Sequence, residues 1–200
     1  MNKFSCTIFF LLSVFIASSQ NIDIDLLKKI NGNRIKAFDP TFKSITNSAV
    51  PLSIATPVLL YSIGLIEKDT LMKQKAVVIG ETFLVSAFIT VVSKQLIKRE
   101  RPYLRYAELE PVVFENSYSM PSGHTSTAFA TATSLSLLYP KWYVIAPSFI
   151  WAGSVGYSRM HLGVHYPSDV LIGALVGSGS ALLMHKANHW LNKNRKKNKI

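Results

Sequence analysis

The apolar residues of this chain gather into long segments that short polar stretches separate. After residue 47, five such segments are predicted to be helices, at 48–66, 76–93, 123–139, 142–157 and 169–185. Several have only about 16 to 18 residues, but each becomes long enough to cross a bilayer if its helix continues into the polar flank. For any single segment, a buried helix of a soluble core is the alternative. Five in succession predict an all-α fold, an integral membrane helical bundle with five core transmembrane helices.

The N-terminal 47 residues have a different pattern. Residues 1–19 combine Lys3, an apolar stretch and then small residues, which is typical of a secretory signal peptide. An uncleaved anchor helix is the alternative, and either would send the following residues across the membrane. Residues 20–47 are polar and mixed, and IDIDLLKKI followed by Asn31-Gly32-Asn33 predicts a short amphipathic helix that ends at a turn. We expect this segment to lie at the periplasmic membrane surface.

The position of the charged residues separates two interpretations of a basic chain. The net charge is +11, yet only 16% of the residues are charged, against roughly 25% in ordinary soluble domains. Six basic residues fall between Lys186 and Lys199 and five between Lys94 and Arg105, while the apolar segments are nearly free of charge. This distribution favours a membrane protein and argues against a nucleic-acid partner. Cys6 is the single cysteine, so an intramolecular disulfide and a Cys-rich metal site are both impossible.

The basic tail at 189–200 is expected to be cytoplasmic by the positive-inside rule. Counting back across five spans then places the links 94–122 and 158–168 outside, as a signal peptide also requires. The stretch KQLIKRERPYLRY breaks the rule, because it carries five basic residues on the non-cytoplasmic side. We therefore expect a function that needs cations there.

The first of three polar clusters lies in that basic stretch. Lys94 and Arg101 are seven residues apart, about two helical turns, so they are predicted to share a helix face with Lys98. Pro102 is predicted to end the helix just after Arg101. Taken alone, the cluster could be a basic flank that snorkels to the membrane interface.

The second cluster, Pro121-Ser122-Gly123-His124, opens the third apolar helix. Ser122 can cap this helix, and Gly123 lets a ligand approach the backbone. Amide groups at a helix N-terminus attract anions, phosphate above all, and His124 would lie beside them. An ordinary helix start with an interfacial histidine is the alternative.

The third cluster lies around 158–169. Ser158 and Arg159 end one apolar segment, and His165 and Asp169 are four residues apart at the start of the next. A carboxylate one helical turn from an imidazole can accept its N–H and fix its tautomer. A surface loop with scattered polar residues is the alternative.

The topology brings all three clusters to one membrane face. Cations and backbone N–H groups bind a phosphoryl group and stabilise the charge that develops on it. A histidine held by an aspartate can be a nucleophile, and a second histidine can protonate the leaving oxygen. Because the sequence has no carboxylate cluster suited to a hard metal ion, it predicts metal-independent phosphoryl transfer.

These clusters resemble the type 2 phosphatidic acid phosphatase (PAP2) superfamily, whose signature has the parts K-x6-RP, PSGH and SR-x5-H-x3-D. The matching residues are Lys94 to Arg101-Pro102, Pro121-Ser122-Gly123-His124, and Ser158-Arg159 to His165 to Asp169. All three parts match in order and without a gap. The resemblance covers about residues 48–188, which we treat as one membrane phosphatase domain ahead of the basic tail.

The resemblance implies hydrolysis of a phosphate ester through a phosphohistidine. It makes His165 the nucleophile, Asp169 the residue that orients it and His124 the general acid. It assigns five residues to the phosphoryl oxygens: Lys94, Arg101, Ser122, Gly123 and Arg159. His161 falls at a position that the signature leaves free and receives no catalytic role.

Integral-membrane members of this family act on lipid phosphates, among them phosphatidate, phosphatidylglycerol phosphate, undecaprenyl diphosphate and the phosphates of lipid A. The resemblance therefore implies a multi-pass membrane phosphatase, and the compact size and signal-like start predict a bacterial enzyme of the inner membrane whose active site faces the periplasm. Its expected partners are a lipid phosphate and the bilayer, with no cofactor, metal or obligate protein partner. The alternatives are a vanadium-haloperoxidase-like oxidase, whose known relatives are soluble, and a non-catalytic membrane protein with a relict site.

Overall fold

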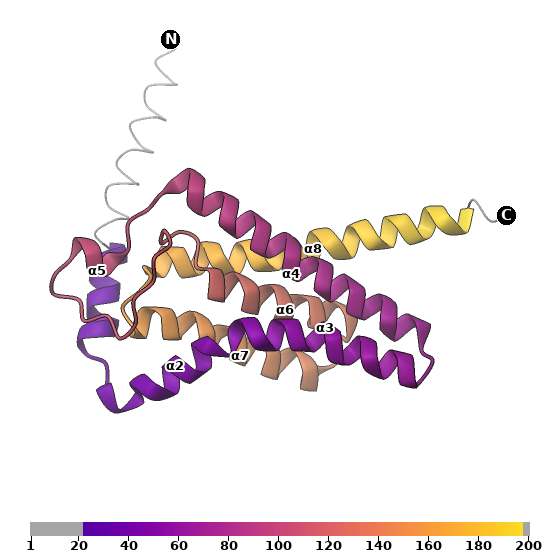
Figure 1. The fold of residues 1–200 in the computed structure, drawn as a ribbon, viewed down its shortest axis with the longest axis horizontal. Coiled ribbons are helices and arrows are strands. Elements are labelled where there is room, and N and C mark those ends of the chain that lie inside the picture. The colour runs from indigo at the N-terminus through magenta and orange to yellow at the C-terminus, as the bar shows by residue number, and fades with distance from the viewer. Residues whose placement is uncertain (1–21, 198–200) are drawn as a thin grey trace, which may run out of the picture.

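The computed structural model describes residues 22–197, without the side chains of 192–197. The predicted signal peptide at 1–19 lies outside these residues, as does the end of the basic tail. The described chain is helical and contains no strand. A first helical stretch runs over 22–32. It is followed by η1 (Lys36–Phe38), α2 (Asp39–Asn47), α3 (Ala49–Ile66), α4 (Thr70–Ile97), α5 (Pro102–Arg105), α6 (Gly123–Leu138), α7 (Trp142–His161) and α8 (Pro167–Lys197), arranged as Figure 1 shows.

Each of the five predicted apolar segments is helical, and α4 and α8 continue well into their polar flanks. Within residues 22–197, three helical stretches are long and apolar enough to cross a membrane: Lys36–Ile66, Thr70–Arg105 and Pro167–Leu191. Their outer surfaces carry large exposed apolar side chains, such as Leu59, Leu84 and Phe88, which are 60%, 64% and 70% exposed. A bilayer would cover such a surface.

The helix α6 lies in the middle of the bundle, where it contacts α3, α4, α7 and α8 (Figure 1). Nine of its 16 residues are buried, and all nine are threonine, serine or alanine. Small side chains allow close approach, and their hydroxyl groups form hydrogen bonds between helices. Five hydroxyl–hydroxyl bonds join α6 to its neighbours: Ser86–Ser126 at 2.6 Å, Thr131–Ser53 at 2.7 Å, Thr90–Ser126 at 2.9 Å, Thr133–Ser178 at 3.0 Å and Ser134–Thr82 at 3.2 Å. Because protein surrounds it, α6 needs less apolar surface than a helix that faces lipid.

The packing of α8 against α6 depends on two glycines, Gly173 and Gly177, whose four-residue spacing predicts such a contact. A Cβ atom at Gly173 would lie 2.7 Å from the carbonyl oxygen of Ser122. A Cβ atom at Gly177 would lie 2.7 Å from the backbone nitrogen of Ala130. Both are backbone atoms, one of α6 and one of its N-cap residue, and they cannot rotate away as a flexible side chain would. The backbones of α6 and α8 therefore approach closely at both glycines.

Replacing Gly177 with alanine is therefore expected to destabilise the bundle by about 1 to 3 kcal/mol, as overpacking usually does. Gly179→Ala is the matched control, because a Cβ atom there has no neighbour within 4 Å. Thermal unfolding of the purified variants in detergent should show a lower Tm for Gly177→Ala. The Tm of the control should be unchanged or slightly higher, because alanine favours a helix over glycine. Equal Tm values for the two variants would contradict this packing.

The end of α4 differs from the sequence prediction. The helix ends at Ile97, and Lys98 takes the left-handed conformation with φ of 50°. Arg101 has extended backbone, with ψ of 150°, and Pro102 begins α5. The prediction that Lys94, Lys98 and Arg101 share one helix face ended by Pro102 is therefore wrong. Proline disfavours helical backbone at the residue before it and is favoured in the first turn of a new helix.

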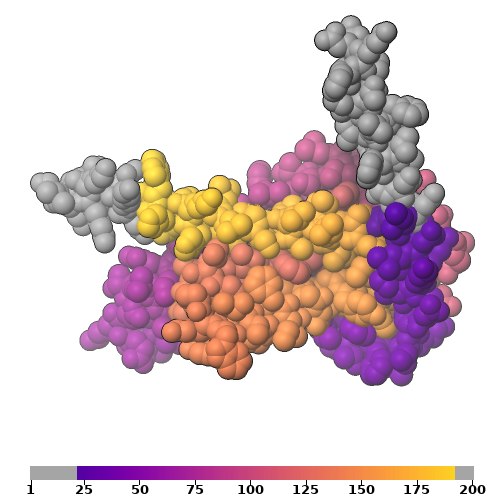
Figure 2. Space-filling view, turned by 180° about the vertical axis from the view of Figure 1, so that it is seen from behind, coloured from indigo at the N-terminus to yellow at the C-terminus, as the bar shows by residue number. Residues whose placement is uncertain are grey.

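Residues 22–47 wrap across the end of the bundle where α5 lies (Figures 1 and 2). The predicted helix before Asn33 is confirmed, and its Leu27 packs with Leu109 and Tyr166 in a small buried cluster. The Asn31 side chain donates to the carbonyl oxygen of His161 at 2.9 Å and accepts from the Glu110 N–H at 3.0 Å. The N-terminal segment is thereby fixed to the end of α7 and to the loop that contains Glu110.

Candidate active site

The residues of the three predicted clusters meet at this end of the bundle. Lys94 lies in the last turn of α4 and Arg101 just before α5. Ser122, Gly123 and His124 form the start of α6. Arg159 lies in the last turn of α7, His165 in the α7–α8 connection and Asp169 in the first turn of α8. Because helices that alternate in direction bring every second connection to the same end, residues up to 75 positions apart become neighbours.

His165 and Asp169 form a buried pair, 1% and 0% exposed. The Nδ1 atom of His165 lies 3.3 Å from Oδ2 of Asp169, and its Nε2 atom lies 3.2 Å from Nη1 of Arg101. A guanidinium group can only donate, so Nε2 accepts and the ring proton resides on Nδ1. The Nε2 lone pair therefore points toward the arginine, as a nucleophile facing a bound anion requires.

Asp169 accepts hydrogen bonds from three residues besides His165. Its Oδ1 accepts from Arg99 at 2.7 Å, and its Oδ2 accepts from the Ser119 hydroxyl at 2.5 Å and the Tyr166 N–H at 3.0 Å. Arg99 also pairs with Asp23 at 2.6 Å and stacks on the Tyr166 ring, 3.7 Å from its centroid. An acceptor with this many donors stays ionised, and its orientation is fixed from both sides.

Burial lowers the pKa of His165 from 6.5 to about 3, although the hydrogen bond to Asp169 opposes the shift. In an unfolded chain the same ring titrates near pH 6.5. The unfolded state therefore takes up a proton between these two values that the folded state does not. The contribution of the neutral His165 ring to the stability of the fold is complete above about pH 6.5 and decreases as the pH falls toward about 3.

A His165→Asn variant should lose less stability on acidification than the wild-type protein, because asparagine does not titrate. We expect the Tm difference between the two proteins to shift in favour of the variant between about pH 7 and about pH 4. Thermal unfolding in detergent at a series of pH values measures this difference in Tm. A parallel pH dependence for the two proteins would show that this ring does not titrate as its burial implies.

Two buried arginines form the most positive part of the site. Arg101 and Arg159 are each 1% exposed, and both form ion pairs with the carboxylate of Glu115. The Arg101 side chain also donates to the carbonyl oxygens of Ser117 at 2.8 Å and Val164 at 2.9 Å. Arg159 donates to the Thr46 hydroxyl at 2.8 Å. The two guanidinium groups thus converge on one position between them, which the Glu115 carboxylate occupies.

Two further predicted residues, His124 and Lys94, lie close enough to this position to interact with its charges. The His124 side chain interacts electrostatically with Arg159, Glu115, Arg101 and Lys94. Lys94 donates to the backbone carbonyl oxygen of Tyr118.

The start of α6 differs in detail from the prediction. Ser122 occupies the N-cap as predicted, but its side chain does not cap the helix; its hydroxyl accepts from Thr125 at 2.9 Å. The Ser122 N–H donates to the Asp169 carbonyl oxygen at 3.0 Å, which connects the start of α6 to the start of α8. A Cβ atom at Gly123 would have only ordinary contact, 3.8 Å from Thr90, so packing alone does not require glycine there.

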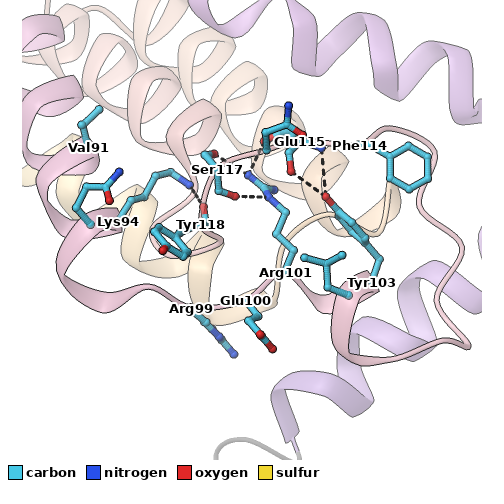
Figure 3. A pocket seen from close by; sticks show the side chains of 13 residues that line it. Val91, Lys94, Arg99, Glu100, Arg101, Tyr103, Phe114, Glu115, Ser117 and Tyr118 are labelled. Atoms are coloured by element: carbon cyan, nitrogen blue, oxygen red, sulfur yellow. Dashed lines mark hydrogen bonds and ion pairs between the residues drawn. The ribbon is translucent and has the colours of Figure 1, made fainter.

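A pocket of about 720 Å³ opens beside Arg101, and Lys94 and Glu115 also line it (Figure 3). Part of its wall is apolar and exposed: Val91, Leu104 and Phe114 are 58%, 71% and 76% exposed. The pocket thus joins a charged interior to an apolar surface.

The other histidines lie outside this cluster. His161 is buried against the Phe42 ring, with a centroid distance of 4.2 Å, and its Nε2 lies 2.8 Å from Asp39. These contacts hold the N-terminal segment to α7. His185 and His189 lie in the second half of α8, beside Val78.

Arg99, Ser119 and Glu115 received no role from the sequence, although each contacts a predicted site residue. Arg99 was visible as a charge in the basic stretch, and it matches no fixed position of the signature. Glu115 is one of several acidic residues in 108–115, and nothing in the pattern distinguishes it from Glu108 or Glu110. Most of their partners lie 44 to 76 residues away in the sequence, where periodicity carries no information.

The fold and this set of side chains define a class of protein, the helical membrane phosphohydrolases with a histidine–aspartate pair beside an arginine-lined anion site. The sequence model of the PAP2 superfamily matches residues 75–193. The chain belongs to this superfamily, as the three-part signature predicts.

Individual relatives agree with this membership. The chain is 32% identical over 184 residues to an undecaprenyl-diphosphatase of Sulfolobus acidocaldarius, a match that covers 88% of this chain and 85% of that protein. Its structure is similar to that of LpxE from Aquifex aeolicus, with a TM-score of 0.72, 25% identity, and coverage of 82% and 95% of the two chains. It is also similar to a transmembrane PAP2-type phosphatidylglycerolphosphate phosphatase from Bacillus subtilis, with a TM-score of 0.71, 25% identity, and coverage of 92% and 94%.

Proposed function

We propose that this protein is a metal-independent phosphatase that hydrolyses a lipid phosphate through a phosphohistidine intermediate on His165. The observation that carries the proposal is the orientation of the His165 ring. Its Nδ1 is paired with Asp169, and its Nε2 faces Arg101 at 3.2 Å, beside the position where Arg101 and Arg159 converge. A phosphoryl group held by the two arginines would lie within reach of this nitrogen.

In the first chemical step, Nε2 of His165 attacks phosphorus and the bond from phosphorus to the ester oxygen breaks. Arg101, Arg159 and Lys94 stabilise the charge on the phosphoryl oxygens. Asp169 stabilises the ring as it becomes positive, because Nδ1–H donates to it throughout. His124, at the start of α6, gives a proton to the leaving oxygen.

In the second step, water attacks phosphorus and the bond to Nε2 breaks. His124, now neutral, takes a proton from that water and returns to its starting state. The products are inorganic phosphate and the neutral His165 ring, so the cycle closes without a metal ion or a redox partner.

We propose further that α3, α4, α6, α7 and α8 all cross the inner membrane and that the site faces the periplasm. Three of the five meet the length and hydropathy required, and the basic residues after His185 support a cytoplasmic C-terminus. The site is at the opposite end of α8 from those residues.

The pocket supports a lipid as the carrier of the phosphate. Its charged side holds a phosphate, while its apolar exposed wall at Val91, Leu104 and Phe114 continues into the surface that lipid would cover. The relatives indicate which headgroups to test, because they include enzymes for a polyprenyl diphosphate and for phosphatidylglycerol phosphate.

A phosphate-release panel on the purified protein in detergent tests the proposal. The panel compares undecaprenyl diphosphate, phosphatidylglycerol phosphate, phosphatidate and lipid A, each with excess chelator. We expect metal-independent turnover of at least one substrate and inhibition by vanadate. The control His189→Asn should retain turnover, because this exposed ring lies far from the site. Absence of phosphate release from all four lipids, or a requirement for added metal, would contradict the proposal.

A further inference from the structure

The anion that occupies the position between the two arginines belongs to the protein itself. Arg101 Nη2 lies 2.6 Å from Oε2 of Glu115, and Arg159 Nη2 pairs with Oε1 of the same carboxylate. One carboxylate therefore bridges the two guanidinium groups. Burial alone would raise the pKa of Glu115, but the charges of Arg159 and Arg101 outweigh it and hold the pKa at about 2. Glu115 is thus a full negative charge at any physiological pH.

The backbone of Glu115 is fixed where its side chain reaches both arginines. The Tyr103 hydroxyl donates to the Glu115 carbonyl oxygen at 3.0 Å and accepts from the Glu115 N–H at 3.2 Å, as Figure 3 shows. The side chain itself lines the pocket and is 24% exposed. The carboxylate therefore has open space beside it, while the arginines behind it are buried.

The arginines do not depend on Glu115 alone for their positions. Arg101 keeps its bonds to two backbone carbonyl oxygens, and Arg159 keeps its bond to Thr46. Among the described residues, the Nε atom of Arg159 is buried and has no hydrogen-bond partner. Arg159 thus has one N–H donor that the carboxylate does not use, and an anion with more acceptor oxygens, such as a phosphate, suits an arginine with a donor to spare.

We propose that Glu115 is a specificity-determining residue, an internal anion that substrate phosphate must displace from Arg101 and Arg159. This inference rests on the proposed function. A phosphate dianion or a diphosphate carries more charge and more acceptor oxygens than the carboxylate, so it displaces Glu115. A monoanionic phosphodiester, which is the headgroup of the abundant bilayer lipids, does not. Glu115 thereby keeps the bulk phospholipid out of the site.

A role in holding the arginines in place is the competing explanation for the same contacts, and it predicts the opposite effect on anion binding. If Glu115 competes with phosphate, removing its charge tightens the binding of inorganic phosphate. If it positions the arginines, removing it weakens that binding.

The test measures binding of inorganic phosphate to the full-length protein in detergent by titration calorimetry. We expect Glu115→Gln and Glu115→Ala to bind phosphate about tenfold or more tightly than the wild type, the range for close charge pairs. In these variants, unlike in the wild type, a phosphodiester lipid should also compete with a phosphomonoester substrate. Glu108→Gln is the matched control, since it removes the same charge from the same loop at an exposed ion pair with Lys28. Its phosphate affinity should equal that of the wild type.

Unchanged or weaker phosphate binding in both Glu115 variants would overturn the inference. If neither variant folds, phosphate binding to Tyr103→Phe tests the inference instead. This variant removes only the hydroxyl that holds the backbone of Glu115, so the carboxylate should be displaced more easily and phosphate should bind more tightly. A measurement of lipid phosphate turnover by the wild-type protein separates failure of the Glu115 inference from failure of the phosphatase proposal. Turnover without tighter binding in the variants refutes the role of Glu115 alone, whereas tighter binding without any wild-type turnover refutes the phosphatase proposal.

Discussion

Replacing His165 with asparagine is expected to lower kcat for lipid phosphate hydrolysis by roughly four to six orders of magnitude, the loss found for a removed nucleophile. Asparagine is close to the ring in size and can still donate to Asp169, so the pocket should keep its shape. It cannot form the bond to phosphorus. Phosphate release under saturating substrate measures the effect.

The same variant should still bind inorganic phosphate, because Arg101 and Arg159 are untouched. Its Tm near neutral pH and its elution volume on size exclusion should match those of the wild type, which separates lost chemistry from lost folding. Residual kcat within about tenfold of the wild type would mean that another group attacks phosphorus.

Replacing His124 with glutamine is expected to lower kcat for a lipid substrate by about two to four orders of magnitude, the usual contribution of a general acid. The loss should depend on the leaving group. A lipid alkoxide needs a proton to leave, whereas nitrophenolate leaves without one, so p-nitrophenyl phosphate should lose much less in the first step.

With that substrate, the variant should show a burst of nitrophenol followed by slow turnover. The reason is that His124 also takes the proton from water in the second step, so the phosphoenzyme accumulates. Stopped-flow absorbance records both phases. An equal loss for both substrates without a burst, or a raised KM with kcat unchanged, would remove His124 from the acid role.

The sequence predicted the helices well because their apolar runs are long and uninterrupted. The segment 123–139 became Gly123–Leu138, and 48–66 became Ala49–Ile66. The prediction that Lys94 and Arg101 share one helix face was wrong, because helical spacing and the effect of proline on its neighbour compete at the end of α4. The spacing of Lys94 and Arg101 fits a helix face, but Pro102 favours extended backbone at Arg101, which is what the structure has.

The candidate site was predictable where the spacing is local or the signature is fixed. His165 and Asp169 are one turn apart, and their pairing follows from that spacing. Contacts that join distant segments were not predictable. Arg99 reaches Asp169 across 70 residues, and Asp23 reaches Ser168 across 145, so only the packed fold reveals them. The roles of the site residues remain predictions until the variants are measured.

Direct trapping of the phosphoenzyme tests the proposed mechanism most closely. The protein is mixed with a phosphate-labelled substrate in chelator, quenched in alkali, which preserves a phosphorus–nitrogen bond, and digested for mass spectrometry. We predict an acid-labile label on the peptide that contains His165, stronger in His124→Gln and absent in His165→Asn. Label on any other residue, or an equal label in His165→Asn, would contradict a phosphohistidine at this position.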